Sequence, residues 1–235
     1  MNSINHSAAK SQPGLAGTLS AASHFIPRLC CLAAALILAG CAKNPADGKT
    51  AAEVKEPNAN AVAQKTAAQS GARTYTITED STIGFFASKV TGSHNGGFKK
   101  FSGEFALADG AINGSGQKVV IEMDSTWADN PKLTGHLKSP DFFNVAAFPQ
   151  ATFELTSSEK IEGSKVKLTG NLTLHGVTKQ ISFPAELSAE GDRAALKAEF
   201  FIKRFDFAIK YPGKANDLIR DEVVIKLDIK AVARA

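Results

Sequence analysis

The C-terminal stretch, DEVVIKLDIKAVARA, alternates apolar and polar residues. Successive side chains of an extended chain point to opposite faces, so this period of two indicates a β-strand with one buried face. The predicted apolar face consists of Val223, Ile225, Leu227, Ile229 and Ala231. A strand of this kind needs neighbours, because a free edge exposes unpaired N–H and C=O groups. The rest of the chain must therefore supply further strands.

Two other segments, KVKLTGNLTL and KQISFPAEL, show the same alternation and are joined by HGVT, which predicts a hairpin. Gly170 occupies an apolar position and indicates a bulge or bend, whereas Pro184 lies on the polar face and indicates an edge or a bulge. Six further segments have the character of strands: TYTIT, STIGFFASKV, FKKFSGEFAL, QKVVIEMD, ATFELTS and RAALKAEFFIKRFDF. Many antiparallel strands with one apolar face predict an all-β sandwich or closed barrel, and about eight strands leave room for one small ligand.

The first 40 residues predict a secretory signal peptide. Arg28 precedes the apolar run LCCLAAALILAGC, which is shorter than the roughly 20 residues that a membrane span requires. Leu38-Ala39-Gly40-Cys41 resembles the lipobox of bacterial lipoproteins, which implies cleavage before Cys41 and acylation of that cysteine. An ordinary signal peptide, in which Cys41 has no role, is the alternative.

Residues 41–72 are predicted to be a flexible tether. The segment from Ala42 to Ala72 is rich in alanine, lacks aromatic residues and shows no convincing periodicity, so it offers little apolar surface to offset the entropy of ordering. As a coil its ends would lie about 30 Å apart. The alternative is that this segment packs on the domain. Residues 73–235 are then a single domain, long enough to bury about 70% of its unfolded surface.

Cysteine and charge content exclude several classes of function. No cysteine follows Cys41, so the mature chain would have no internal disulfide, thiolate metal site or cysteine nucleophile. Removal of residues 1–40 takes away Lys10 and Arg28 and no acidic residue, which lowers the net charge from +4 to +2. A nearly neutral chain gives no support to nucleic-acid binding.

Residues 130–147 interrupt the strands with a helical excursion. Asn130 and Ser139 are each followed by proline, an arrangement typical of a helix N-cap and first helical position. The excursion also carries several large apolar side chains, including the pair Phe142 and Phe143. These side chains must cover something: either they plug a filled core, which the residues alone favour, or they form a lid and wall for an apolar ligand.

Candidate catalytic and metal-binding residues are few. His94, His136 and His175 have no partner at metal-ligand spacing, so no metal site and no cofactor are predicted. No nucleophile motif or phosphate loop is present. Arg204 continues an inward-facing row, and a buried guanidinium would need Asp206, Asp221 or a ligand anion as partner; the alternative is a strand end at which the arginine reaches solvent.

Three blocks carry a family resemblance: KLTGHLKSPDFFNVAAFPQATFELTS, KLTGNLTLHGVTKQISFPAEL and RFDFAI. Together with the strand pattern between Tyr75 and Val232 they resemble the YceI-like family of bacterial envelope proteins. This resemblance implies an extended, lipocalin-like antiparallel β-barrel that holds a polyisoprenoid or another long-chain amphiphile, and it implies binding rather than catalysis. The chain departs from the family at Asp80, where many members have histidine, and at Ala208, where glycine is frequent.

The resemblance and the alternation together predict site residues. Possible head-group contacts are His94, Lys99 and Arg204, and Cys41 is the lipid attachment site. The predicted apolar lining consists of Phe85, Phe101, Phe105, Leu137, Phe142, Phe143, Phe153, Leu168, Leu172, Phe183, Phe200 and Leu227. A register error of one residue would turn a whole strand to the other face.

The resulting functional hypothesis is a lipid-anchored carrier, sink or store for a polyisoprenoid-like lipid. It would lie on the periplasmic side of the bacterial envelope, joined to a membrane through Cys41. The residue after the cysteine is Ala42, whereas an aspartate at this position retains some lipoproteins at the inner membrane. The alanine therefore favours the outer membrane. The alternatives are a structural or stress-related protein with a filled barrel and, third, a hydrolase using His136 with Asp141 or Glu122. The sequence does not predict the oligomeric state, and it is compatible with a dimer.

Overall fold

The computed structural model describes residues 43–57, 71–112 and 117–234. Gly40–Ala235 form one compact unit. The predicted signal peptide and Cys41 lie outside the described residues. Within the described ranges, no helix is long and apolar enough to cross a membrane.

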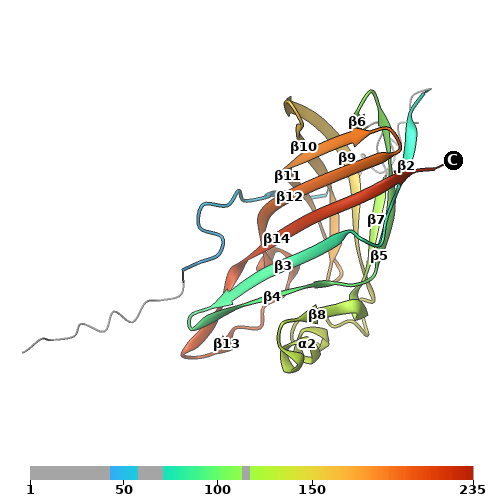
Figure 1. Ribbon diagram of the computed structural model, residues 1–235. Coiled ribbons are helices and arrows are strands. Elements are labelled where there is room, and N and C mark those ends of the chain that lie inside the picture. Colours follow the sequence, from blue (N-terminus) through green and yellow to red (C-terminus); the bar gives the residue numbers. More distant parts are fainter. Residues whose placement is uncertain (1–42, 58–70, 113–116, 235) are drawn as a thin grey trace, which may run out of the picture. The chain divides into compact units, whose positions relative to one another are not determined.

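Eight strands form a closed antiparallel barrel (Figure 1). Each pairs with the next around the circuit, and β14 closes it by pairing with both β12 and β2. In circuit order the strands are β2 (Arg73–Ile77), β5 (Phe101–Ala108), β7 (Lys118–Glu122), β9 (Gln150–Glu162), β10 (Lys165–Leu174), β11 (Val177–Glu190), β12 (Arg193–Lys203) and β14 (Asp217–Ala233). This arrangement confirms the prediction of an all-β, lipocalin-like barrel of about eight strands.

At one end the barrel wall is extended by shorter strands. β14 leaves β2 and continues along β3 (Thr82–Lys89), which pairs with β4 (Gly92–Phe98), which in turn pairs with β8 (Thr126–Ala128). β2 and β3 are thus two parts of one bent stave. The remaining short elements are β1 (Glu53–Lys55), β6 (Ala111–Ile112), β13 (Gly213–Lys214) and the 3-10 turns η1 (Met123–Ser125) and η2 (Arg204–Phe207).

Two local predictions for β10 and β11 are confirmed. The hairpin turn consists of His175 and Gly176, both with positive φ (51° and 75°), as in the type I′ turns that match the twist of paired strands. The β9–β10 register shifts between Thr169 and Gly170. A Cβ on Gly170 would lie 2.4 Å from the ring of Phe153, so this bulge needs glycine.

The prediction of a flexible tether is wrong for residues 43–57. β1 pairs with β11 in register, and Ala52 is buried in the barrel core, where Val54 also packs. The composition argument failed because two apolar residues at alternate positions suffice to dock a short strand on an existing sheet edge. Residues 58–70 of the predicted tether lie outside the described residues.

The helical excursion is shorter than predicted. α2 (Pro131–Lys138) begins as expected, with the Asn130 side chain accepting hydrogen bonds from the backbone of Lys132 and Leu133. No second helix starts at Ser139. The chain forms turns there instead, because Asn144 adopts a left-handed conformation (φ 45°) and its N–H bonds back to the Ser139 carbonyl.

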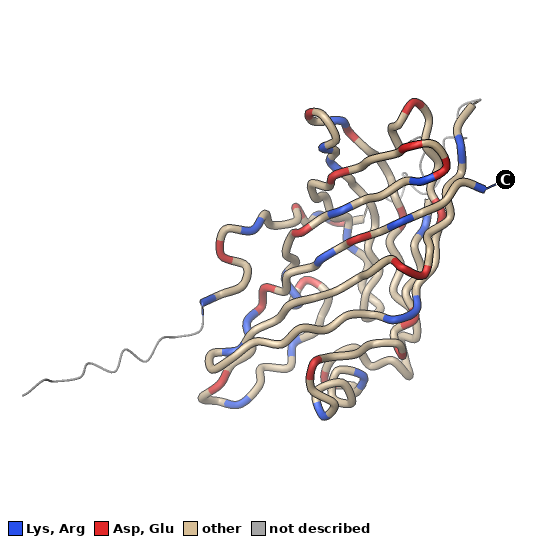
Figure 2. The backbone as a smooth tube through the Cα atoms, viewed as in Figure 1, with Lys and Arg blue, Asp and Glu red and all other residues tan. Residues whose placement is uncertain are grey.

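Charged residues lie mainly on the outside of this fold. Figure 2 shows basic and acidic positions interspersed along the barrel strands rather than gathered by sign. Several form exposed pairs between neighbouring strands, such as Lys226 with Glu199 (3.5 Å). Such pairs contribute little to stability, so the apolar interior holds the barrel together.

Candidate ligand cavity

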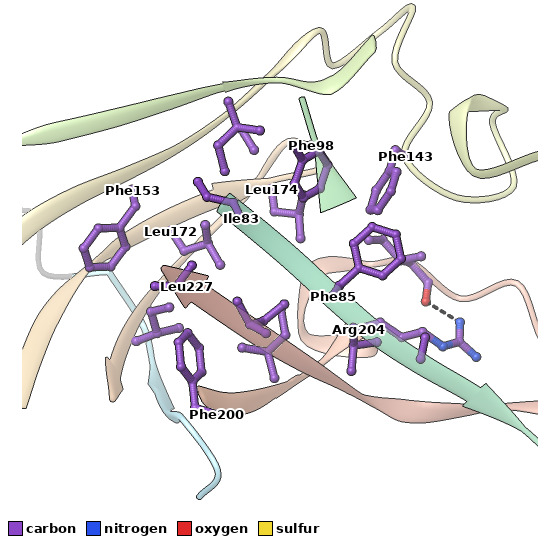
Figure 3. A pocket seen from close by; sticks show the side chains of 18 of the residues that line it. Ile83, Phe85, Phe98, Phe143, Phe153, Leu172, Leu174, Phe200, Arg204 and Leu227 are labelled. Carbon is purple, nitrogen blue, oxygen red and sulfur yellow. Dashed lines mark hydrogen bonds between the residues drawn. The ribbon is translucent and has the colours of Figure 1, made fainter. Parts of the chain in front are cut away.

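An apolar cavity of about 200 Å³ lies inside the barrel, at the end that α2 covers. Its wall is formed by inward-facing side chains of β3, β12, β14 and their neighbours. Among the described residues that line it, Arg204 is the only polar one. Figure 3 shows Phe85, Phe98 and Phe143 turned toward the same space, with Leu172, Phe153 and Phe200 further along it. A cavity with such a wall has affinity for hydrocarbon and offers almost nothing to a polar solute.

Nine of the twelve predicted lining residues lie in the cavity wall. They are Phe85, Leu137, Phe142, Phe143, Phe153, Leu172, Phe183, Phe200 and Leu227. For the six of these that lie on strands, the alternation placed the side chains on the inner face in the correct register. The predicted lining list omitted other wall residues, notably Ile83 and Ile225 of the same inward rows and Phe98 of the glycine-rich strand β4.

The other three predicted lining residues, Phe101, Phe105 and Leu168, do not line the cavity. Leu168 is buried in the main core cluster, and Phe101 and Phe105 pack against it. Phe105 stacks on Tyr75 with ring centroids 6.0 Å apart. These side chains belong to a part of the barrel in which side chains meet across the interior, and alternation cannot distinguish such a packed layer from a hollow one.

The excursion after β8 forms a lid over the hollow part. Leu137 and Phe142 are buried in a small apolar cluster with Phe85 and Ile209. The ring of Phe143 contacts those of Phe85 and Phe98 at centroid distances of 6.4 and 6.0 Å. The lid thus borders a cavity here. The alternative of a plug on a filled core describes only the part of the barrel away from the lid, where Phe105 stacks on Tyr75.

Arg204 is buried, with 4% of its surface exposed, so the alternative of a strand end in solvent is wrong. Its partners are also not the expected carboxylates. The guanidinium donates to the backbone carbonyls of Arg220 (3.0 Å), Ile209 (2.7 Å) and Ile219 (3.1 Å). Burial lowers the pKa of Arg204, and the nearby charge of Asp221 opposes that shift. Arg204 therefore ties η2 and the segment after it to the start of β14.

Two other predicted head-group residues lie away from the cavity wall. His94 Nδ1 lies 2.7 Å from Asp129 Oδ1, and Asp129 also accepts the N–H of Asn95. These contacts lower the pKa of Asp129, the bond from Asn95 most of all. Lys99 is exposed. His94 lies on β4, which forms a regular strand paired with β3 and β8, and Lys99 follows that strand directly.

The histidine considered for catalysis is part of the lid. His136 Nε2 lies 2.8 Å from Asp141 Oδ2, and its ring packs between Phe142 and Tyr211. Glu122, the other suggested partner, accepts a hydrogen bond from Gln150 instead. No group of three or more side chains able to hold a metal ion occurs in the described part of the chain.

A closed antiparallel barrel around an apolar cavity defines a lipocalin-like binding fold. The chain belongs to the YceI-like family, because the model of the YceI-like domain matches residues 75–231. The proteins YceI of Salmonella arizonae and Salmonella newport are 42% identical to it over 120 residues, which cover 48% of this chain and 62% of each relative. The match thus spans less than two thirds of these relatives.

Solved structures agree on the fold. BcnA of Burkholderia cenocepacia superposes with a TM-score of 0.60 at 25% identity, over 65% of this chain and 96% of that one. The YceI protein of Campylobacter jejuni gives a TM-score of 0.52 at 25% identity, over 60% and 85% of the two chains. A polyisoprenoid binding domain from Saccharophagus degradans gives 0.56 at 18% identity, over 68% and 98%. At that identity the last match shows the fold alone.

Proposed function

We propose that this barrel binds the hydrocarbon chain of a polyisoprenoid or a similar long-chain amphiphile. The observation that carries the proposal is the cavity wall, in which Arg204 is the only polar side chain among the described lining residues. Burial of a chain there is worth about 0.8 kcal/mol per CH₂ group, so affinity needs no specific polar contact. The polyisoprenoid binding domain with the same fold is consistent with this ligand class.

Arg204 is the group suited to the polar end of the ligand. A guanidinium has five N–H donors, and the three backbone carbonyls leave donor capacity for one more acceptor. A hydroxyl, phosphate or carboxylate at the end of the chain would supply that acceptor.

We further propose that the protein is a lipid-anchored carrier, sink or store in the bacterial cell envelope. The support is the sequence Leu38-Ala39-Gly40-Cys41, which would yield an acylated Cys41 on the periplasmic side; Ala42 favours the outer membrane. An anchor with more than one acyl chain would be stable. The Cys41→Ser variant should leave the membrane fraction, and retention of that variant in the membrane would contradict the anchor.

Native mass spectrometry of the barrel tests ligand binding. Protein beginning at Ala42, which lacks the acylated cysteine, is purified from bacterial cells without detergent, and a stoichiometric long-chain adduct is expected. Leu172→Asp places a charge in the cavity wall and should abolish the adduct, whereas Ile161→Asp, on an exposed side chain (58% exposed), should retain it. An apo mass together with no uptake of any offered isoprenoid would contradict binding and favour a structural barrel.

A further inference from the structure

The wall of the barrel has a seam between β11 and β12. These strands pair only over Glu186–Glu190 and Arg193–Lys197, and beyond Glu186 they pair with each other no further. The N-terminal segment lies in the opening. The N–H of Ala52 donates to the Phe201 carbonyl (2.8 Å), and the N–H of Phe201 donates to the Thr50 carbonyl (3.0 Å). β1 then pairs with the other edge of the seam, at Gln180–Ser182.

The inserted segment packs behind side chains that form the inner wall. Ala52 and Val54 pack into the core cluster, with Val54 directly opposite Ile181. Ile181 and Ile202, one from each edge of the seam, both line the cavity. Residues 50–55 therefore act as an additional stave that bridges the two edges of the seam and backs the wall residues Ile181 and Ile202.

The segment does not fill the whole seam. A second hollow remains where it ends, lined by Thr50, Pro184–Glu186, Lys197–Glu199, Lys165 and Leu227. Leu227 also lines the main cavity. The seam edges here carry the small side chains of Ala185 and Ala198, so a single layer of side chains separates the outer hollow from the cavity.

Pro184 explains why the two strands cannot close this gap themselves. The N–H of Leu187 donates to Ser164 on the β10 side, and N–H groups of successive residues in a strand point to alternate sides. The backbone nitrogen of residue 184 consequently faces the seam, and proline has no N–H to donate there. The pairing of β11 with β12 accordingly ends at Glu186, two residues short of Pro184.

We propose that this seam is a lateral entrance for the alkyl chain of an amphiphile. The N-terminal segment, residues 43–57, closes the entrance with its residues 50–55 and undocks when the chain enters; this inference rests on the proposed function. Entry under the lid requires displacement of Leu137 and Phe142, which are buried. Entry at the seam requires displacement of Ala46, Ala52 and Val54, whose apolar surface is much smaller. It also breaks the backbone pairing of the segment with Phe201 and with β11.

Two ion pairs of this segment are at the surface. Lys49 pairs with Glu199 (3.0 Å) and Glu53 with Lys167 (3.3 Å), and all four side chains are more than one third exposed. Pairs of this kind hold a segment weakly and are screened by salt. An acylated Cys41 would also lie no more than about 30 Å of extended chain from Thr50, which would keep the seam near the membrane that supplies the chain.

A disulfide across the seam tests the entrance. Val54 and Ile181 are a directly opposed, non-hydrogen-bonded pair, a geometry with Cα atoms close enough for a disulfide. The Val54→Cys, Ile181→Cys variant is made in a protein that begins at Ala42 and so contains nearly all of the compact unit Gly40–Ala235. This protein lacks the three natural cysteines, which all precede Ala42. Uptake of cis-parinaric acid from phosphatidylethanolamine vesicles is followed by the rise of its fluorescence. Oxidation should slow uptake at least tenfold relative to the reduced form, with equilibrium binding unchanged within twofold.

Two controls isolate the seam. The Ala194→Cys, Ala231→Cys pair bridges β12 and β14 away from it, and its oxidation should leave the rate unchanged. Val54→Thr, which keeps shape but weakens the apolar contact, should speed uptake at least threefold. Equal rates for the oxidised and reduced seam variant would overturn the lateral entrance while leaving binding intact. Failure of the unaltered protein to bind the probe at all would instead overturn the proposed function.

Discussion

Phe143 of the lid packs edge-on against Phe85 of β3, with their ring centroids 6.4 Å apart and their planes at 71°. The contact joins two segments far apart in the sequence and closes the apolar cavity at the end that the lid covers. Edge-to-face pairs of this kind add about 0.5–1.5 kcal/mol beyond the area they bury. The lid is therefore held on the barrel by the same side chains that would contact a ligand.

Phe143→Asp should weaken binding of cis-parinaric acid at least tenfold. The carboxylate would face the apolar space between Phe85 and Phe98, where burying a charge is costly. Fluorescence titration gives the Kd, and circular dichroism checks that the barrel is intact. Ile161→Asp is the matched control because its side chain is 58% exposed, and it should bind as the unaltered protein does. Equal affinities for the two variants would show that the lid does not contact the ligand.

Arg204→Met should destabilise the fold by about 2–5 kcal/mol. The substitution keeps an unbranched, flexible side chain but removes the donors for the carbonyls of Arg220, Ile209 and Ile219. Each buried acceptor left unsatisfied costs roughly 1–3 kcal/mol. Urea denaturation measures the change. Arg234→Met is the control, because the Arg234 side chain is 71% exposed and its ion pair with Glu104 is long, at 3.7 Å. Its free energy of unfolding should change by no more than about 0.5 kcal/mol. A similar midpoint for both variants would mean that the carbonyls find other donors.

Much of the fold follows from sequence periodicity, and the failures have identifiable causes. Alternation placed Leu172 and Leu227 correctly in the cavity wall but could not tell that Phe105 lies in a packed layer, because both kinds of residue face inward. The low apolar content of residues 41–72 concealed the docking of Ala52, whose partner strand edge exists only because β11 and β12 part. Inward alternation predicted the burial of Arg204, but its carbonyl partners come from segments whose conformation no sequence pattern specifies.

Through the ionisation of Asp217, the stability of the folded protein should depend on pH only at acidic pH. Its carboxylate accepts the N–H (3.0 Å) and hydroxyl (2.9 Å) of Thr91 and pairs with Lys89, joining the β3–β4 turn to β14. These contacts, that with Lys89 first, hold the pKa of Asp217 below the ordinary value of 3.8 for an aspartate side chain. A carboxyl with a lowered folded-state pKa contributes stability that is present above its unfolded pKa and is lost as the pH falls through the folded pKa.

The matched variant for this prediction is Asp217→Asn. Its deficit in urea midpoint should be constant above about pH 5 and should shrink below about pH 4, as the unaltered carboxyl becomes protonated. The Asp192→Asn variant is the control, since Asp192 is 76% exposed and should show a much smaller effect. A deficit for Asp217→Asn that stays the same from pH 7 to pH 3 would show that its charge has no role in holding the turn.

Ala208→Gly should stabilise the protein, unlike most substitutions by glycine. Ala208 follows η2 with φ at 57°, a left-handed conformation that costs a residue with a Cβ about 1–2 kcal/mol and glycine almost nothing. Glycine's greater freedom in the unfolded chain offsets part of that gain, so a rise of about 0.5–1 kcal/mol in the free energy of unfolding is expected. The backbone is held there because the N–H of Ala208 caps η2 through the carbonyls of Arg204 and Phe205.

Ala194→Gly is the control for this comparison. Ala194 is buried within β12 and paired with Ala231, so its extended backbone gains nothing from glycine, and the variant should lose about 1 kcal/mol. Urea denaturation of both variants at neutral pH measures the two changes. Opposite signs are expected because the same chemical change relieves strain at one position and adds only unfolded-state entropy at the other. Destabilisation by both would show that Ala208 carries no strain worth relieving.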